Sequence, residues 1–448
     1  MNKMFLFPAL LLAFANAGAQ EGDTAQAAAR AEDPVGEELS KLKSQLEGLN
    51  ESYLETKATV DKLSKIKVSG YVQAQWQHTD TNQAASVAGG AFPPNSDQRF
   101  QVRRGRVKAV YSGSTSQYAL QIDVIPTGVS IKDAYATLME PWLKTFSFTM
   151  GVFDRPFGYE ISYSSSSRES PERSRVYQTV FPGERDMGAK LEINPPAELG
   201  FLQYFNLKGG VFTGMGPTAN EIDAEQDLIG RVGFKAPFYD LNLAIDGGFS
   251  MYMGKVLAVN DTAFSIGDTS FIRTTGNNRD VFDRNVMGVD AQLYYDLPVI
   301  GGLSLRGEYL WGEMPGVSGS SGPYAAATAP LFNREFMGWY VMWVQSLGTK
   351  VQGVLKYDVY DPNTGVEGKN VRSLNGPAAG ETAPGAADLA YNTLGFGGVF
   401  HWDENLKFTA YYDMVSNEKA GNTATGGSAA FKKDRKDNVF TFRMQVKF

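Results

Sequence analysis

The chain has 448 residues, no cysteine, and a formal net charge of −7 from 42 Lys and Arg against 49 Asp and Glu. The lack of cysteine excludes disulfides and thiol chemistry, and the acidic balance argues against a nucleic-acid-binding protein. Aromatic residues make up 12% of the chain, although its mean hydropathy is only −0.26.

The first residues predict a secretory signal peptide. Lys3 gives a positively charged start, residues 5–15 form an apolar core too short to span a bilayer, and Ala17-Gly18-Ala19 is a small-residue cleavage site. We therefore expect residues 1–19 to be a signal peptide. Residues 20–36 are small and polar, lack aromatics, and predict a flexible linker.

Residues 37–66 carry apolar side chains at alternating spacings of three and four, which is typical of a coiled coil. These positions are Leu39, Leu42, Leu46, Leu49, Tyr53, Thr56, Val60 and Leu63. The alternative is a single amphipathic helix lying on the rest of the protein. The narrow apolar stripe favours the coiled coil.

From residue 67 onward, apolar and polar residues alternate, which predicts an all-β fold. We expect sixteen strands, at 67–78, 99–112, 116–125, 129–140, 144–153, 186–194, 201–213, 227–238, 241–254, 285–296, 302–312, 335–346, 349–361, 388–403, 406–416 and 436–448.

Short and long connections alternate between these strands, with residues 126–128 as the exception. This is the plan of an outer-membrane barrel with tight periplasmic turns and long outer loops, whereas a soluble β-sandwich gives no reason for it. We expect residues 67–448 to form a 16-stranded antiparallel transmembrane β-barrel around an aqueous channel, with an N-terminal periplasmic coiled-coil helix. The terminal Phe448 resembles the recognition signal of bacterial outer-membrane proteins.

The segment RFQVRRGRVKAVYSG (99–113) concentrates positive charge in one predicted strand. The apolar residues of its second half share one parity and face lipid, so Arg104, Arg106 and Lys108 face the lumen. Arg103 has the outward parity near the strand end. Either its side chain reaches the membrane interface, or Gly105 marks a bulge that resets the face.

Four segments in this order resemble the phosphate-selective porin O/P family of Gram-negative outer membranes: RRGRV (103–107), IKDAYATL (131–138), GVFDRPFGYE (151–160) and PGERDMGAKL (182–191). The resemblance covers roughly residues 67–448. It implies a trimeric sixteen-stranded porin whose third loop, 154–185, folds inward to narrow the pore, with anion selectivity through lumen arginines. The named phosphate channels also have a central lysine cluster, and no such cluster is recognisable in this sequence.

The third loop carries arginines and carboxylates in similar numbers. It is either a charged constriction that selects ions or a self-paired loop held to the wall by salt bridges. Whether the lumen arginines meet a passing anion or a carboxylate such as Asp123 on the next strand stays open. The candidate pore-lining and anion-binding residues are Arg104, Arg106, Lys108, Arg155, Arg168, Arg173, Arg175, Arg185 and Arg231.

These features predict an outer-membrane porin for passive diffusion of small hydrophilic solutes, with anions preferred and phosphate or similar oxyanions among the candidates. The alternative is a general non-selective porin whose coiled coil tethers the outer membrane to the periplasmic side. An enzyme would need a Ser/His or Asp/His arrangement, and neither His78 nor His401 has a recognisable partner. We therefore expect no catalytic residue, metal or cofactor.

The expected partners are small anionic or hydrophilic solutes, outer-membrane lipid, and two further copies of the chain in a homotrimer. Residues 37–66 could in addition contact the cell-wall layer. No nucleic-acid partner is expected, because the basic segment 99–113 is predicted to face the inside of the barrel and the net charge of the chain is negative.

Overall fold

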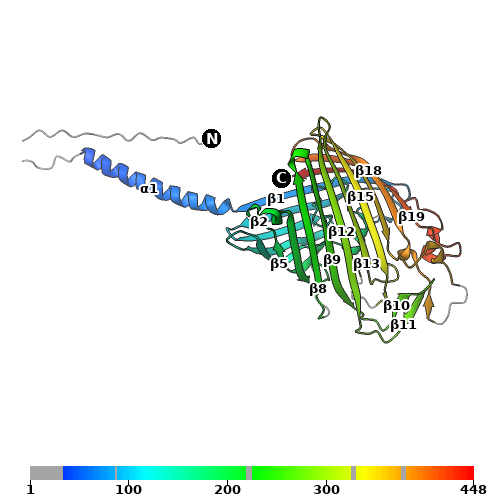
Figure 1. Ribbon diagram of the computed structural model, residues 1–448. Coiled ribbons are helices and arrows are strands. Elements are labelled where there is room, and N and C mark those ends of the chain that lie inside the picture. The colour runs from blue at the N-terminus through cyan, green and yellow to red at the C-terminus, as the bar shows by residue number, and fades with distance from the viewer. Residues whose placement is uncertain (1–33, 86–87, 218–223, 324–328, 375–379) are drawn as a thin grey trace, which may run out of the picture. The chain divides into compact units, whose positions relative to one another are not determined.

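The computed structural model describes residues 34–85, 88–217, 224–323, 329–374 and 380–448. The expected signal peptide and most of the expected linker lie outside these residues. The chain divides into two compact units. The first contains helix α1 (Pro34–Leu63), and the second, residues 64–448, is a barrel (Figure 1).

Helix α1 begins three residues before the expected coiled coil, at a proline, which suits the first turn of a helix because its missing N–H needs no partner there. The apolar positions of the predicted stripe are exposed along its length, with Leu46 and Leu49 each at 71%. Among the described residues, no helix is both long and apolar enough to cross a membrane.

In the described part of the chain, sixteen strands close into one antiparallel barrel in which each pairs with its neighbours in barrel order, as the sequence predicts. They are β1 (Ile66–Thr79), β2 (Gln98–Ser112), β3 (Ser116–Ile125), β4 (Gly128–Met139), β5 (Phe146–Asp154), β6 (Arg185–Ile193), β7 (Phe205–Phe212), β8 (Asp227–Phe238), β9 (Leu243–Leu257), β12 (Val281–Leu297), β13 (Gly301–Glu313), β15 (Glu335–Leu347), β16 (Val351–Asp361), β18 (Tyr391–His401), β19 (Leu406–Asn417) and β20 (Val439–Lys447).

Long connections carry a second, smaller sheet that the sequence pattern does not reveal. Its strands are β10 (Ala263–Ile266), β11 (Phe271–Thr274), β14 (Leu331–Phe332) and β17 (Glu381–Thr382), and they pair in the order β14-β10-β11-β17. Runs of two to four residues are too short to show a period of two. Other connections contain short helices: α2 (Arg175–Val180), η1 (Ala197–Tyr204), η2 (Tyr239–Leu241), η3 (Gly368–Asn370), η4 (Ala386–Asp388) and η5 (Gly426–Lys432).

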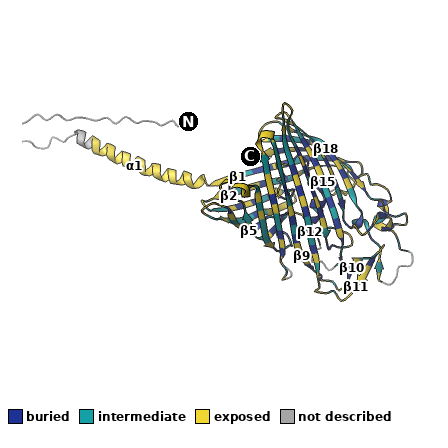
Figure 2. Ribbon diagram, in the orientation of Figure 1, coloured by how far each residue is buried: buried dark blue, intermediate teal, exposed yellow. Residues whose placement is uncertain are grey.

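Buried and exposed residues alternate along the barrel strands (Figure 2). On β3, for example, Leu120 and Val124 are about half exposed, while Gln121 and Asp123 are buried. On this strand the outward positions are apolar and the inward positions are polar, which is the inverse of a water-soluble barrel. The faces that the sequence assigns to this strand are therefore confirmed.

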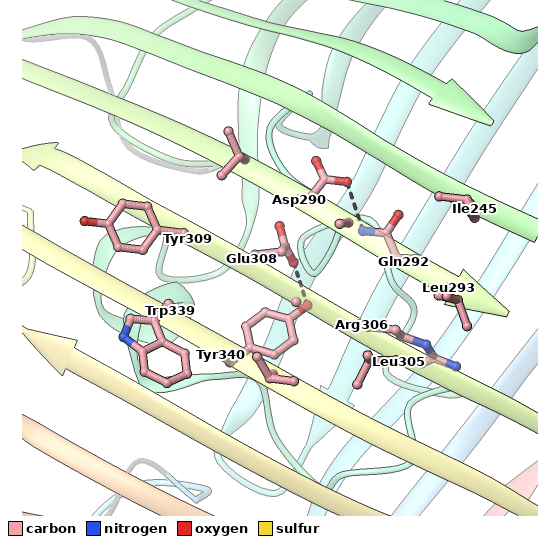
Figure 3. A pocket seen from close by; sticks show the side chains of 14 residues that line it. Ile245, Asp290, Gln292, Leu293, Leu305, Arg306, Glu308, Tyr309, Trp339 and Tyr340 are labelled. Atoms are coloured by element: carbon pink, nitrogen blue, oxygen red, sulfur yellow. Dashed lines mark hydrogen bonds between the residues drawn. The ribbon is translucent and has the colours of Figure 1, made fainter. Parts of the chain in front are cut away.

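A groove of about 720 Å³ lies against the outward face of β9, β12, β13 and β15 rather than in the lumen. Leu293, Leu305, Tyr309 and Trp339 surround it (Figure 3). Because these side chains are apolar or aromatic, this groove belongs to the lipid-compatible surface of the barrel.

Two β-bulges add a cation to the inward face. The register between β1 and β2 shifts by one residue, which leaves Arg103 as the extra residue of β2. A second shift, between β3 and β4, leaves Lys132 as the extra residue of β4. A bulge re-aims a side chain that a regular strand would send to the opposite face. Arg103 and its neighbour Arg104 therefore both reach Glu172 inside the lumen.

Deleting Arg103 should leave a folded barrel, because it removes only the extra residue and preserves the pairing on both sides. We expect a loss of ~1–2 kcal/mol from the missing ion pair. Deleting Leu355 of β16, where both registers are regular, should abolish folding because half of the strand would turn its charges to the outside. Heat-dependent mobility in SDS gels measures the folded fraction. Equal folded yields from the two deletions would contradict the bulge.

Candidate functional site

The third loop, residues 155–184 between β5 and β6, crosses the interior of the barrel. Its helix α2 and the residues around it form a buried apolar cluster with inward side chains of β5 and of β7 to β19. Phe157, Val176, Tyr177 and Phe181 are each at most 1% exposed in this cluster. The loop is therefore fixed inside the lumen by packed apolar contacts with the wall.

The carboxylate of Glu308 on β13 anchors the start of the loop. It accepts hydrogen bonds from the backbone N–H groups of Tyr159 (2.7 Å) and Glu160 (2.6 Å) and from the hydroxyls of Tyr177 (2.5 Å) and Tyr340 (2.6 Å). The bond to Tyr340 is visible in Figure 3. Four donors satisfy a buried carboxylate, which would otherwise be costly to bury.

Gly158 makes this anchor possible within the GVFDRPFGYE segment. Its φ of +62° lies in the left-handed region, and a Cβ there would collide with the Tyr177 hydroxyl and the Glu308 carboxylate. Glycine is the residue type that meets both requirements. The sequence motif is thus explained by the turn that brings the loop against the wall.

The middle of the loop is held by Glu172, which binds three arginines. Its carboxylate lies 2.9 Å from Arg103 Nε, 2.7 Å from Arg104 Nη2 and 2.8 Å from Arg443 Nη2. Burial opposes ionisation, but the three guanidinium groups outweigh it and hold the pKa of Glu172 well below its usual range. The stabilisation is therefore complete above the ordinary carboxyl pKa and is lost only as the pH falls through the depressed folded-state value.

Most of the other candidate cations also lie against carboxylates. The pairs are Arg106 with Asp123 (3.1 Å), Lys108 with Asp133 (3.1 Å), Arg155 with Asp186 (2.9 Å), Arg185 with Asp133 and Asp154 (3.1 and 3.0 Å), Arg231 with Asp290 (2.6 Å), and Arg173 with Glu184. The open question about Arg106 is thereby answered: its partner is Asp123 on the next strand.

Two loop arginines differ from the rest. Arg168 is 3% exposed, and none of its three guanidinium nitrogens has a hydrogen-bond partner among the described residues. Burial, together with the nearby cations Arg173 and Arg104, lowers the pKa of the Arg168 guanidinium. Arg175 lies over the ring of Tyr391, with 4.0 Å between its Cζ and the ring centroid. The third loop is thus largely self-paired and pinned to the wall.

Two adjoining recesses lie in the lumen beside the start of the loop. The first, about 280 Å³, lies between residues 154–162 and the inward face of β6 to β9 and β12. The second, about 290 Å³, lies on β2 to β6. Asp154 and Lys190 line both. Of the candidate residues, Arg155 and Arg231 line the first recess and Lys108 lines the second.

The first recess also contains lysines that the strand-by-strand sequence analysis did not single out as a group. Lys190, Lys208 and Lys235 lie on three consecutive strands, β6, β7 and β8, and all line it. Each lies at a sequence position whose parity predicts a lumen-facing side chain. The parity of single strands does not give the register between strands, and the register brings the three lysines together.

Replacing Glu172 by Gln should release the middle of the third loop, because three guanidinium groups would then face a neutral amide. We expect the free energy of unfolding in lipid vesicles to fall by ~3–5 kcal/mol, the usual cost of breaking a buried ion pair from one side. Glu198→Gln, at an exposed position of η1, is the matched control and should change it by less than about 0.5 kcal/mol. Equal losses in the two variants would show that Glu172 does not hold the loop.

No protein-family model and no curated protein matches the sequence. Among solved structures, the chain is similar to an anion-selective porin from Comamonas acidovorans, at 12% identity over 86% of this chain and 99% of that one, with a TM-score of 0.50. It is also similar to OprB of Pseudomonas putida, at 10% identity over 87% and 96%, with a TM-score of 0.52. At such identities the likeness shows the fold, which is that of a porin-type barrel, and the narrower resemblance to phosphate-selective porins stays a prediction.

Proposed function

We propose that this protein is a porin of a Gram-negative outer membrane that lets small hydrophilic solutes diffuse passively through its lumen. The observation that carries the proposal is the closed sixteen-stranded barrel with apolar outward positions and charged inward positions. Such a surface suits lipid outside and water inside. The short turns, the start of β1 and the end of β20 would then lie on the periplasmic side of the membrane.

We further propose that the channel prefers anions, because of the charges that line the two recesses. Their lining contains six cationic side chains, those of Lys108, Arg155, Lys190, Lys208, Arg231 and Lys235, against four carboxylates, those of Asp133, Asp154, Glu192 and Asp246. Arg155 and Arg231 also bind Asp186 and Asp290, and Arg185 binds Asp133 and Asp154, so the balance with these partners is seven cations to six carboxylates. An excess of one sign in a narrow aqueous path raises the local concentration of the opposite ion. The Comamonas porin is described as anion-selective, but the likeness extends only to fold, so the preference rests on these charges.

Arg104 and Arg106 contribute less to this preference than their number suggests. Both are at most 7% exposed, and both lie against carboxylates, those of Glu172 and Asp123. A paired charge acts at a distance as a dipole. Phosphate or a similar oxyanion as the specific solute remains part of the proposal without a residue that singles it out.

Reversal potential in planar bilayers under a KCl gradient should have the sign of chloride preference. Lys190→Gln combined with Lys235→Gln should shift it towards cations, because two lumen charges are lost. Lys144→Gln combined with Lys350→Gln removes the same charge from exposed turns and should leave it unchanged. A cation-selective wild-type channel would overturn the anion preference, and a protein without conductance would overturn the porin.

We also propose that three copies assemble through α1. Its leucines at alternating spacings of three and four are exposed along one stripe, and an isolated helix with such a stripe gains stability by burying it against identical helices. Glu38 and Lys43 flank the stripe at positions that face each other between parallel helices, where opposite charges attract. A tether to the cell-wall layer is the competing role for the same helix.

Leu46→Asp combined with Leu49→Asp should weaken the trimer, since each buried leucine contributes about 1.5–3 kcal/mol. Light scattering of the detergent-solubilised full chain gives its mass, and the dissociation temperature on SDS gels gives its stability. Ser40→Asp combined with Ser44→Asp adds two carboxylates outside the stripe as a control. If both variants keep the wild-type mass and dissociation temperature, α1 does not hold the oligomer, and the tether becomes the better account.

A further inference from the structure

The Arg231 guanidinium, which lines the first recess, lies on a floor of two facing glycines. Gly233 of β8 and Gly248 of β9 pair directly and both have inward parity. A Cβ at either position would run into the Arg231 guanidinium, which lies across them. The recess volume of about 280 Å³ is that of about nine water molecules, which is more than a halide ion needs and enough for an organic solute.

Like charges lie close together around this floor. Lys208 of β7 lies directly opposite Arg231 of β8 in the register, and like charges in this position destabilise a sheet. Asp290 binds Arg231 at 2.6 Å and offsets part of this repulsion. Lys208 and Lys190 share a single carboxylate, that of Glu192, at 3.4 and 2.9 Å. One carboxylate between two ammonium groups leaves positive charge for an additional anion to neutralise.

Two acceptor atoms at the recess lack a donor. Asn206 and Asp246 both line it, and the Oδ1 atom of each is buried without a hydrogen-bond partner in the described part of the protein. A buried acceptor without a donor costs free energy. Asn206 pairs with Gly233 in the register, beside the glycine floor, and Asp246 lies opposite Lys235. Hydroxyl groups of a solute are donors that fit such a place.

We propose that the first recess is a binding station for small hydroxylated organic monoanions, such as sugar acids. The solute's carboxylate lies between Lys208 and Arg231, and its hydroxyls donate to Asn206 and Asp246. The carboxylate of Asp246 also repels a second acidic group, which favours a single charge on the solute. This station rests on the proposed porin function and names a solute class for it. Binding has to stay weak, because a channel that holds its solute tightly does not conduct.

The test uses the full chain in planar bilayers in KCl, with D-gluconate as the probe and acetate as an anion of equal charge without hydroxyls. Gluconate should reduce the KCl current at a lower concentration than acetate. Lys208→Gln should raise the half-blocking gluconate concentration by about tenfold, the effect of losing one charge-assisted hydrogen bond. Lys447→Gln, which removes the same charge from β20 on another part of the wall, should leave it unchanged.

Asn206→Ala supplies a second variant that keeps every charge. It should raise the half-blocking gluconate concentration by roughly two- to fivefold and leave the acetate response unchanged. Equal block by acetate and gluconate in the wild type would overturn the station, as would equal gluconate block in the Lys208→Gln and Lys447→Gln channels. In both cases the channel still conducts, whereas the absence of KCl conductance would overturn the porin function itself.

Discussion

Closing a sheet into a barrel forces alternate side chains of each strand into one shared interior, and the charged ones among them must find partners there. In this barrel the outward positions are apolar, so the inward positions carry the charge of the wall. The two bulges increase this crowding by turning Arg103 and Lys132 inward as well. The third loop follows from this constraint, because it brings carboxylates to cations that their own strands leave incompletely neutralised.

Glu172 illustrates how the loop meets that requirement. One carboxylate reaches three arginines that belong to β2 and β20, strands that lie on either side of β1. Near the start of the loop the relation is reversed, since the wall supplies Glu308 and the loop supplies the backbone donors. Beyond Glu172 in the chain, α2 packs against apolar inward side chains of the wall. Recesses remain beside the loop on β2 to β9 and β12, and near the turns that join β8 to β9 and β12 to β13.

The alternation of side chains along the strands was enough to predict the sixteen strands, because a period of two is repeated over about ten residues in each and only one face tolerates lipid. The bulge could be predicted only as one of two explanations for Arg103, because the register between β2 and β1 decides whether an extra residue is present. The partners of Arg104 and Arg106 could not be predicted. Glu172 lies far away in sequence, and Asp123 meets Arg106 only through the register of β2 and β3.

The lysines of β6 to β8 are predicted to face the lumen, but their meeting around one recess could not be predicted, for the same reason. Each has the lumen parity by itself, but which of them meet around the recess depends on the register of neighbouring strands, and no single strand shows that coincidence. The small sheet in the long connections was missed because two to four residues do not display a period. Sequence patterns therefore predicted the strands and their faces well, because each strand shows its alternation by itself. They predicted the contacts inside the lumen poorly, because those contacts depend on which strands pair and in what register.

Selectivity in such a lumen depends on which charges stay uncompensated, rather than on how many arginines the strands contain. A guanidinium that binds a carboxylate at under 3 Å, as Arg104 does, presents a dipole whose field falls off faster than that of a single charge, and ionic screening reduces it further. Lys190 and Lys208 share one carboxylate, so part of their charge stays available to a solute. The most basic strand, β2, is for this reason chiefly the anchor of the third loop, while less basic neighbouring strands provide the wall that an anion meets.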